Sequence, residues 1–121
     1  MNPFLARQQR IGQTGRKAEK KVATRLGGKV TPASGAAMNK GDITLPDFLM
    51  EAKSTTGDSL GLKYEWLTKI AGEAQLVGKA PALSVTFVDP SGRPHRDGAW
   101  VCVPEWLWKE LQLIAAEALI R

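Results

Sequence analysis

Apolar residues recur at helical spacing in three segments of the chain. The first predicts a helix over residues 14–26, with Thr14 as a possible cap and Gly27 and Gly28 at its end. The second predicts a helix over residues 62–77, and the third a terminal helix that Pro104 opens and that runs to about Ile120. Each segment carries an apolar stripe that can cover a sheet.

Shorter segments between these helices alternate apolar and polar residues, or are apolar throughout, and predict strands. They lie at residues 29–32, 43–45, 48–53, 83–87 and 99–103, with turns at Pro46-Asp47 and at residues 89–92. The order is helix, three strands, helix, two strands, helix. It predicts an α/β fold with a mixed central sheet of about five strands flanked by helices.

The size and composition are those of one globular domain. The chain has 121 residues, 43% hydrophobic and 24% charged, and we expect a basic arm at residues 1–13 and one domain at residues 14–121. No apolar run approaches the roughly 20 residues of a membrane span, so we expect a cytoplasmic protein with no membrane partner. The single cysteine, Cys102, excludes an internal disulfide and is expected to be a buried core residue.

Positive charge is concentrated at the start of the chain. Residues 1–40 contain nine Lys or Arg and one acid, Glu19, for a net charge of +8, whereas residues 41–121 have a net charge of −3. Such asymmetry suggests that the N-terminal part binds a polyanion, of which nucleic acid is the commonest. A merely solvated basic face is the alternative, and charge alone does not separate the two.

The strand at residues 48–53 carries two opposite charges on one face. Its alternation points Phe48, Met50 and Ala52 one way, and the face opposite carries Glu51 and Lys53 with Leu49. Buried charge is costly unless it is paired. A salt bridge would satisfy both groups. The other explanation is a divalent metal held by Asp42 and Glu51, with Lys53 beside the substrate.

Glu19 is the one acid in the basic first third of the chain. At about 100° per residue it lies in the middle of the apolar stripe formed by Val22, Ala23 and Leu26. An inward carboxylate needs a partner, and we expect Glu19 to point toward the sheet that carries Asp42 and Glu51. A structural ion pair with Lys53 is the alternative.

Three carboxylates without a histidine cluster suit a hard cation with oxygen ligands, so magnesium is expected, with manganese as a substitute. The lone His95 is expected to be exposed. Magnesium at a surface that binds a polyanion points to phosphodiester hydrolysis, in which Lys53 orients or deprotonates the attacking water or stabilises the phosphorane charge.

The ordered residues Glu19, Asp42 and Glu51-Ala52-Lys53 resemble the PD-(D/E)XK nuclease superfamily. Within it the chain is similar to the archaeal-type and phage-encoded Holliday junction resolvases over residues 14–88. The segments that carry this resemblance are Gly15-Arg16-Lys17-Ala18-Glu19, Ala33-Ser34-Gly35, Lys53-Ser54-Thr55 and Gly78-Lys79-Ala80-Pro81. Gly41 stands where many members have proline, at a position that supplies no ligand.

The resemblance implies a restriction-endonuclease-like core and a catalytic set. It implies Glu19, Asp42, Glu51 and the Ala52 carbonyl as metal ligands, Lys53 as the catalytic lysine, and Ser34 at a backbone phosphate. A simple turn serine is the alternative for Ser34. The residues expected to contact DNA are Arg7, Arg10, Arg16, Lys17, Lys20, Ser34, Lys40, Ser54 and Thr55.

A resolvase of this kind would nick four-way junctions symmetrically as a homodimer in a bacterial, archaeal or phage-infected cell. A candidate interface is the apolar excess around Trp100, Trp106 and Trp108. Two other functions stay open: a PD-(D/E)XK nuclease with another DNA target, restriction-like or end-processing, and a DNA-binding module without catalysis.

Overall fold

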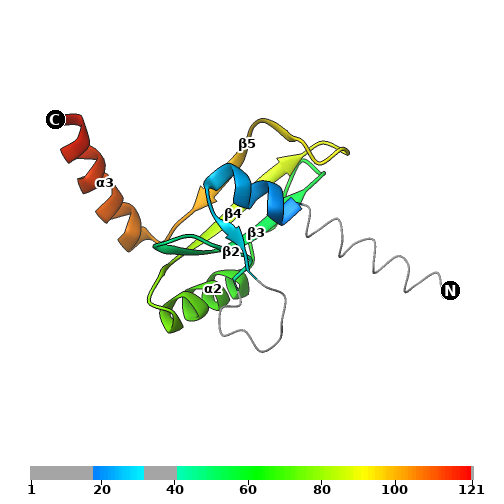
Figure 1. The fold of residues 1–121 in the computed structure, drawn as a ribbon. Helices are drawn as coiled ribbons and strands as arrows, with labels where there is room; N and C mark the ends of the chain where they lie inside the picture. Colours follow the sequence, from blue (N-terminus) through cyan, green and yellow to red (C-terminus); the bar gives the residue numbers. More distant parts are fainter. Residues whose placement is uncertain (1–17, 32–40, 121) are drawn as a thin grey trace.

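The computed structural model describes residues 18–31 and 41–120 and has an α/β architecture (Figure 1). A mixed sheet of five strands is flanked by three helices, as the sequence predicts, while the N-terminal arm lies outside the described residues. The elements after the N-terminal helix at residues 18–26 are β1 (Lys29–Val30), β2 (Ile43–Thr44), β3 (Phe48–Thr55), α2 (Tyr64–Leu76), β4 (Ala80–Val88), β5 (Pro94–Cys102) and α3 (Glu105–Ile120).

The strands follow their chain order across the sheet, β1-β2-β3-β4-β5. Three of the four pairings are antiparallel, and β3 and β4 are parallel, with Met50 opposite Ala82 and Glu51 opposite Leu83. A parallel pair needs a crossover connection, and α2 provides it. Because α2 is packed on β3 and β4, it lies directly above the face of β3 that carries Glu51.

The two faces of β3 pack against different helices, which confirms its predicted alternation. On one face, Val22 and Ala23 of the N-terminal helix pack with Met50, and Ala52 lies against the same cluster. On the other face, Leu49 packs with Ile70 and Ala74 of α2, with Val77 at the margin. This strand is therefore central to both halves of the core.

Glycines end the two helices that cover the sheet. Gly27 and Gly78 have positive φ angles of 76° and 68°. The amide after each glycine donates back into the helix, from Gly28 N to Ala23 O at 2.8 Å and from Lys79 N to Ala74 O at 2.9 Å. This is the Schellman arrangement, which glycine adopts without the steric cost of a Cβ atom.

Three strands are longer than their hydrophobic patterns predict, and one of them, β3, continues past Lys53 to Thr55. β4 begins at Ala80, because its first residues pair in parallel with the start of β3, and β5 begins at Pro94 within a polar segment. His95 is exposed, as expected. Cys102 is half-buried at the end of β5 and not the fully buried core residue that the sequence predicts, because β5 is an edge strand that is exposed over most of its length.

α3 differs from the other helices in its packing. Leu107 is its one buried residue among the described positions, and the helix extends away from the sheet (Figure 1). Its predicted apolar stripe therefore lies largely exposed. Among the described residues, none of the helices is long and apolar enough to cross a membrane.

Candidate functional site at the open edge of β3

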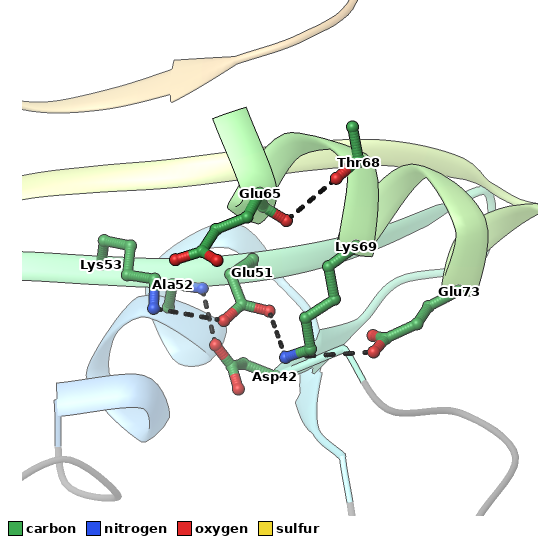
Figure 2. A network of polar contacts seen from close by, with 8 residues as sticks. All are labelled: Asp42, Glu51, Ala52, Lys53, Glu65, Thr68, Lys69 and Glu73. Carbon is green, nitrogen blue, oxygen red and sulfur yellow. Dashed lines mark hydrogen bonds and ion pairs between the residues drawn. The ribbon is translucent and has the colours of Figure 1, made fainter. Parts of the chain in front are cut away.

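The site forms at the start of β2, where that short strand leaves one edge of β3 uncovered from Glu51 onward. β2 pairs only with Leu49 and Met50, and beyond that point the Asp42 side chain replaces the missing strand. Asp42 Oδ2 accepts a hydrogen bond of 2.8 Å from the Ala52 amide (Figure 2). Since the N–H and C=O of one residue in an extended strand point to the same edge, the Ala52 carbonyl faces the side on which Asp42 lies.

Gly41 allows the chain to pass close to β3 immediately before Asp42. A Cβ atom at this position would lie 2.4 Å from Leu49 Cγ, and Leu49 is fully buried between the sheet and α2. The Leu49 side chain therefore has no space to move aside. The lack of a side chain at Gly41 is what permits the approach of Asp42 to the Ala52 amide.

Glu51 is the buried charge of the site, with only 6% of its surface exposed. Its Oε1 lies 3.5 Å from Lys53 Nζ, and its Oε2 lies 3.7 Å from Lys69 Nζ of α2 (Figure 2). Burial raises the pKa of the Glu51 carboxyl above its usual range, and the negative charge of Asp42 raises it further. The two lysines act in the opposite direction without cancelling this effect.

A further carboxylate, that of Glu73, lies near Lys69. Lys69 Nζ is 3.9 Å from Glu73 Oε1, one helical turn further along α2. Within the described part of the chain, the buried oxygens Glu51 Oε2 and Glu73 Oε2 accept no hydrogen bond. Buried oxygens without a donor are costly, so this side of the site has capacity for a further cation or donor.

The ring of Trp66 in α2 contacts the ammonium group of Lys53, the candidate catalytic lysine that also pairs with Glu51. Lys53 Nζ lies 4.4 Å from the centroid of the Trp66 ring, and Lys63 Nζ lies 5.7 Å from it. A cation over an aromatic face is stabilised electrostatically without losing its charge. Lys53 is thereby held between the ring and the Glu51 carboxylate.

Trp66, Lys69 and Glu73 are site residues that sequence reasoning did not assign to the site, although Trp66 belongs to the apolar stripe expected for the helix over residues 62–77. They lie on α2 at spacings of three and four residues, so they share the face that Ile70 and Ala74 press onto β3. The signal was visible as two charged residues at helical spacing beside the apolar stripe. Its meaning depends on α2 covering β3, which only the fold shows.

Glu19 lies on the N-terminal helix, which packs against the face of β3 that carries Met50, while Glu51 lies on the other face. Its side chain is half-buried and has an interaction of its own. In residues 18–31 and 41–120, no three His, Cys, Asp or Glu side chains gather closely enough to hold a metal. The three-carboxylate ligand set stays a prediction, and Asp42 and Glu51 are the two members that lie together.

The predicted DNA contacts fall partly on described residues. Lys20 and Ser54 are exposed, and Thr55 is half-buried with its hydroxyl accepting the Gly57 amide at 3.0 Å. By the alternation of β3, Ser54 shares a face with Ala52, whereas Thr55 shares the face of Lys53. The remaining predicted contacts lie outside the described residues, and they are Arg7, Arg10, Arg16, Lys17, Ser34 and Lys40.

The chain was compared with protein-family models, with curated proteins and with solved structures, and none of the three comparisons gave a match.

The residues of the site fit a hard divalent cation in their donor chemistry. Asp42, Glu51 and the Ala52 carbonyl offer only oxygen, which magnesium prefers. Glu51 Oε2 is buried without a hydrogen-bond donor, and its carboxylate is destabilised by the neighbouring Asp42 charge. A divalent cation would relieve both costs.

Proposed function

We propose that this protein is a magnesium-dependent endodeoxyribonuclease of the PD-(D/E)XK type. The observation that carries the proposal is the convergence of Asp42, Glu51 and Lys53 at the open edge of β3, with a buried Glu51 oxygen that lacks a donor. Two carboxylates that can hold a metal ion, with a lysine beside them, are groups that can support metal-assisted phosphodiester hydrolysis.

Each residue has a separate role in this proposal. Asp42, Glu51 and the Ala52 carbonyl would hold magnesium, and Glu19 is the third carboxylate that the family resemblance implies. When bound, magnesium supplies a more acidic water and neutralises charge that develops on the phosphate. Lys53 orients the attacking water or donates to a phosphate oxygen, and Trp66 and Glu51 together keep its ammonium in place.

For the substrate we propose a four-way DNA junction, cut symmetrically by a homodimer, as in the resolvases that the sequence resembles. The net charge of +8 over residues 1–40 supports a DNA substrate, because phosphate contacts dominate such binding. A bacterial, archaeal or phage-infected cytoplasm is the proposed location. A restriction-like or end-processing nuclease would use the same residues on another DNA target.

One observation favours a second candidate, a DNA-binding module without catalysis. Glu51 already lies within 4 Å of two lysine ammonium groups, Lys53 at 3.5 Å and Lys69 at 3.7 Å. Such a cluster can exist for structure alone, since a buried carboxylate needs compensation whatever its role. In that case the acids would have no part in DNA chemistry.

Cleavage assays on two DNA substrates decide between these functions. We expect the full chain with Mg²⁺ to nick a four-way junction, to act weakly on a linear duplex of the same sequence, and to be inactive with a chelator. Binding without cleavage of any DNA would favour the module. Equal cleavage of both substrates would favour a nuclease of another specificity.

Substitutions then test whether the observed activity arises at this site. We expect Asp42→Asn and Glu51→Gln to lose cleavage while DNA binding is retained. Asp47→Asn is the matched control, because Asp47 is exposed in the turn before β3 and lies away from the edge that carries Ala52. Normal cleavage by either site variant would contradict the metal-site assignment.

A further inference from the structure

The ammonium group of Lys69 is divided between two buried carboxylates. Its Nζ lies 3.7 Å from Glu51 Oε2 and 3.9 Å from Glu73 Oε1, and both distances are longer than a hydrogen bond (Figure 2). Among the described residues, Glu51 Oε2 and Glu73 Oε2 are buried oxygens without a hydrogen-bond donor. Each carboxylate therefore keeps an oxygen that a closer cation would stabilise.

Lys69 can move from one carboxylate to the other, whereas the carboxylates are enclosed. Its side chain is 55% exposed, and the side chains of Glu51 and Glu73 are 8% and 11% exposed. Lys69 and Glu73 are one helical turn apart on α2, the spacing at which opposite charges pair along a helix. Rotation about the side-chain bonds of Lys69 would bring its ammonium group fully onto Glu73, with no change in the backbone.

The place of Lys69 beside Glu51 matters because Glu51 is a proposed metal ligand. An ammonium group and a divalent cation repel each other, and both are attracted by the Glu51 carboxylate. A metal ion at Glu51 therefore binds against the charge of Lys69 unless that charge moves away. Glu73 offers a place for it, because its buried Oε2 still lacks a donor among the described residues.

We propose that Lys69 compensates Glu51 in the metal-free protein and passes to Glu73 when a divalent ion binds. This inference rests on the proposed metal site at Asp42 and Glu51. Lys69 then competes with the ion, and Glu73 favours binding without being a ligand, so the two positioning residues set the metal concentration at which the site fills. Neither residue belongs to the segments that carry the family resemblance.

Metal binding in the absence of DNA tests this exchange. The probe is Mn²⁺ added to the full chain, with free Mn²⁺ measured by electron paramagnetic resonance and Mg²⁺ added as a competitor. Lys69→Met should tighten Mn²⁺ binding by about tenfold or more, because the ion no longer displaces an ammonium group. The variant should stay folded, since Lys53 still compensates Glu51.

A charge change elsewhere provides the matched control. Lys63→Met removes the same charge from the exposed residue before α2. Because exposed charges are screened by salt and water, it should change the affinity for Mn²⁺ by less than about twofold. A tenfold effect of Lys69→Met alone would therefore come from its position beside Glu51 and not from the net charge of the protein.

Glu73 is tested in two backgrounds. Glu73→Gln keeps the size of the side chain and should weaken Mn²⁺ binding by about fivefold in the otherwise wild-type chain, because Lys69 then stays at Glu51. In the Lys69→Met background the same substitution should have little effect, since no ammonium group remains to be received. This double-mutant cycle separates a residue that receives Lys69 from one that binds the ion directly.

Two results would overturn the exchange and leave the proposed nuclease standing. Equal weakening by Glu73→Gln in both backgrounds would make Glu73 a ligand of the ion. An unchanged affinity in Lys69→Met would leave Lys69 as a structural partner of Glu51. A wild type and a Lys69→Met variant that both bind no Mn²⁺ would overturn the proposed metal site together with the exchange.

Discussion

Lys53 Nζ lies 4.4 Å from the centroid of the Trp66 ring and 3.5 Å from Glu51 Oε1, so the ammonium group is fixed between an aromatic face and a carboxylate. The two partners come from α2 and from β3, and they meet because α2 crosses over the strand that carries Lys53. A lysine held in this way keeps one orientation, which is what a group acting on a water or a phosphate needs.

Replacing Lys53 separates catalysis from structure. In the proposed function Lys53→Ala should lower single-turnover cleavage by about 100-fold or more, because the lysine acts on the reacting groups. The fold should survive, since Lys69 still compensates Glu51. Lys69→Ala is the matched control, which removes the other lysine near that carboxylate. Equal reductions of cleavage in both variants would show that charge compensation of Glu51, and not Lys53 itself, is what the site requires.

Trp66 is expected to act by positioning Lys53. Trp66→Leu should reduce cleavage by about fivefold, which corresponds to the roughly 1 kcal/mol of an aromatic–cation interaction. Trp66→Phe should restore most of the activity because it retains an aromatic face. The measurement is cleavage at saturating DNA beside thermal stability. If leucine and phenylalanine variants were equally impaired, the ring would serve packing alone.

The raised pKa of Glu51 predicts a specific pH dependence of stability without metal. A carboxyl whose pKa is higher in the folded state binds its proton more tightly there, so its contribution to stability falls as pH rises from about 4.5, the ordinary pKa of a glutamate, through the raised pKa. Glu51→Gln should remove this fall and be the more stable protein above that interval. Denaturant unfolding against pH tests this, with Asp58→Asn at an exposed loop position as control.

Added Mg²⁺ should make the wild type more stable than Glu51→Gln, the reverse of the order expected without metal. Binding to the ionised Glu51 stabilises the wild type, and Glu51→Gln should gain less from added Mg²⁺ in the same unfolding experiment. An identical response of both proteins to Mg²⁺ would mean that the ion binds elsewhere or not at all.

Gly41→Ala tests how tightly the site is built. The new Cβ would lie 2.4 Å from the Cγ of fully buried Leu49, so we expect a decrease of about 1–3 kcal/mol in the free energy of unfolding and displacement of Asp42. Gly72→Ala is the control, because a Cβ there meets nothing within 4 Å and should stabilise α2 by about 0.5–1 kcal/mol. Equal stability of the two variants would show that the chain around Gly41 adjusts freely.

The N-terminal arm is expected to bind phosphates. Deletion of residues 1–12 removes Arg7 and Arg10 and should weaken DNA binding regardless of sequence. The slope of log affinity against log salt should fall by about 0.9 for each duplex phosphate that the shortened chain no longer neutralises. A binding titration at several salt concentrations provides this slope, and an unchanged slope would place the arm away from the DNA.

The mixed sheet was predictable from the sequence because each element has its own local signal. Glycines 27 and 78 end helices, the alternation over residues 48–53 separates two faces, and the helical spacing of Ile70 and Ala74 marks the buried side of α2. Strand starts were harder to predict. Pro94 to Gly98 are polar or small, so their place in β5 depends on pairing with β4, which no local pattern expresses.

The candidate site also has a part that the sequence predicts and a part that only the tertiary structure shows. The sequence by itself determined that Glu51 and Lys53 share one strand face, since alternation along a strand is a property of the backbone. Only the tertiary structure decided that Asp42 accepts the Ala52 amide, that α2 brings Trp66, Lys69 and Glu73 to Glu51, and that the helix carrying Glu19 covers the opposite face. These relations depend on strand ends and on the crossing of elements far apart in sequence, and short-range periodicity contains no information about them.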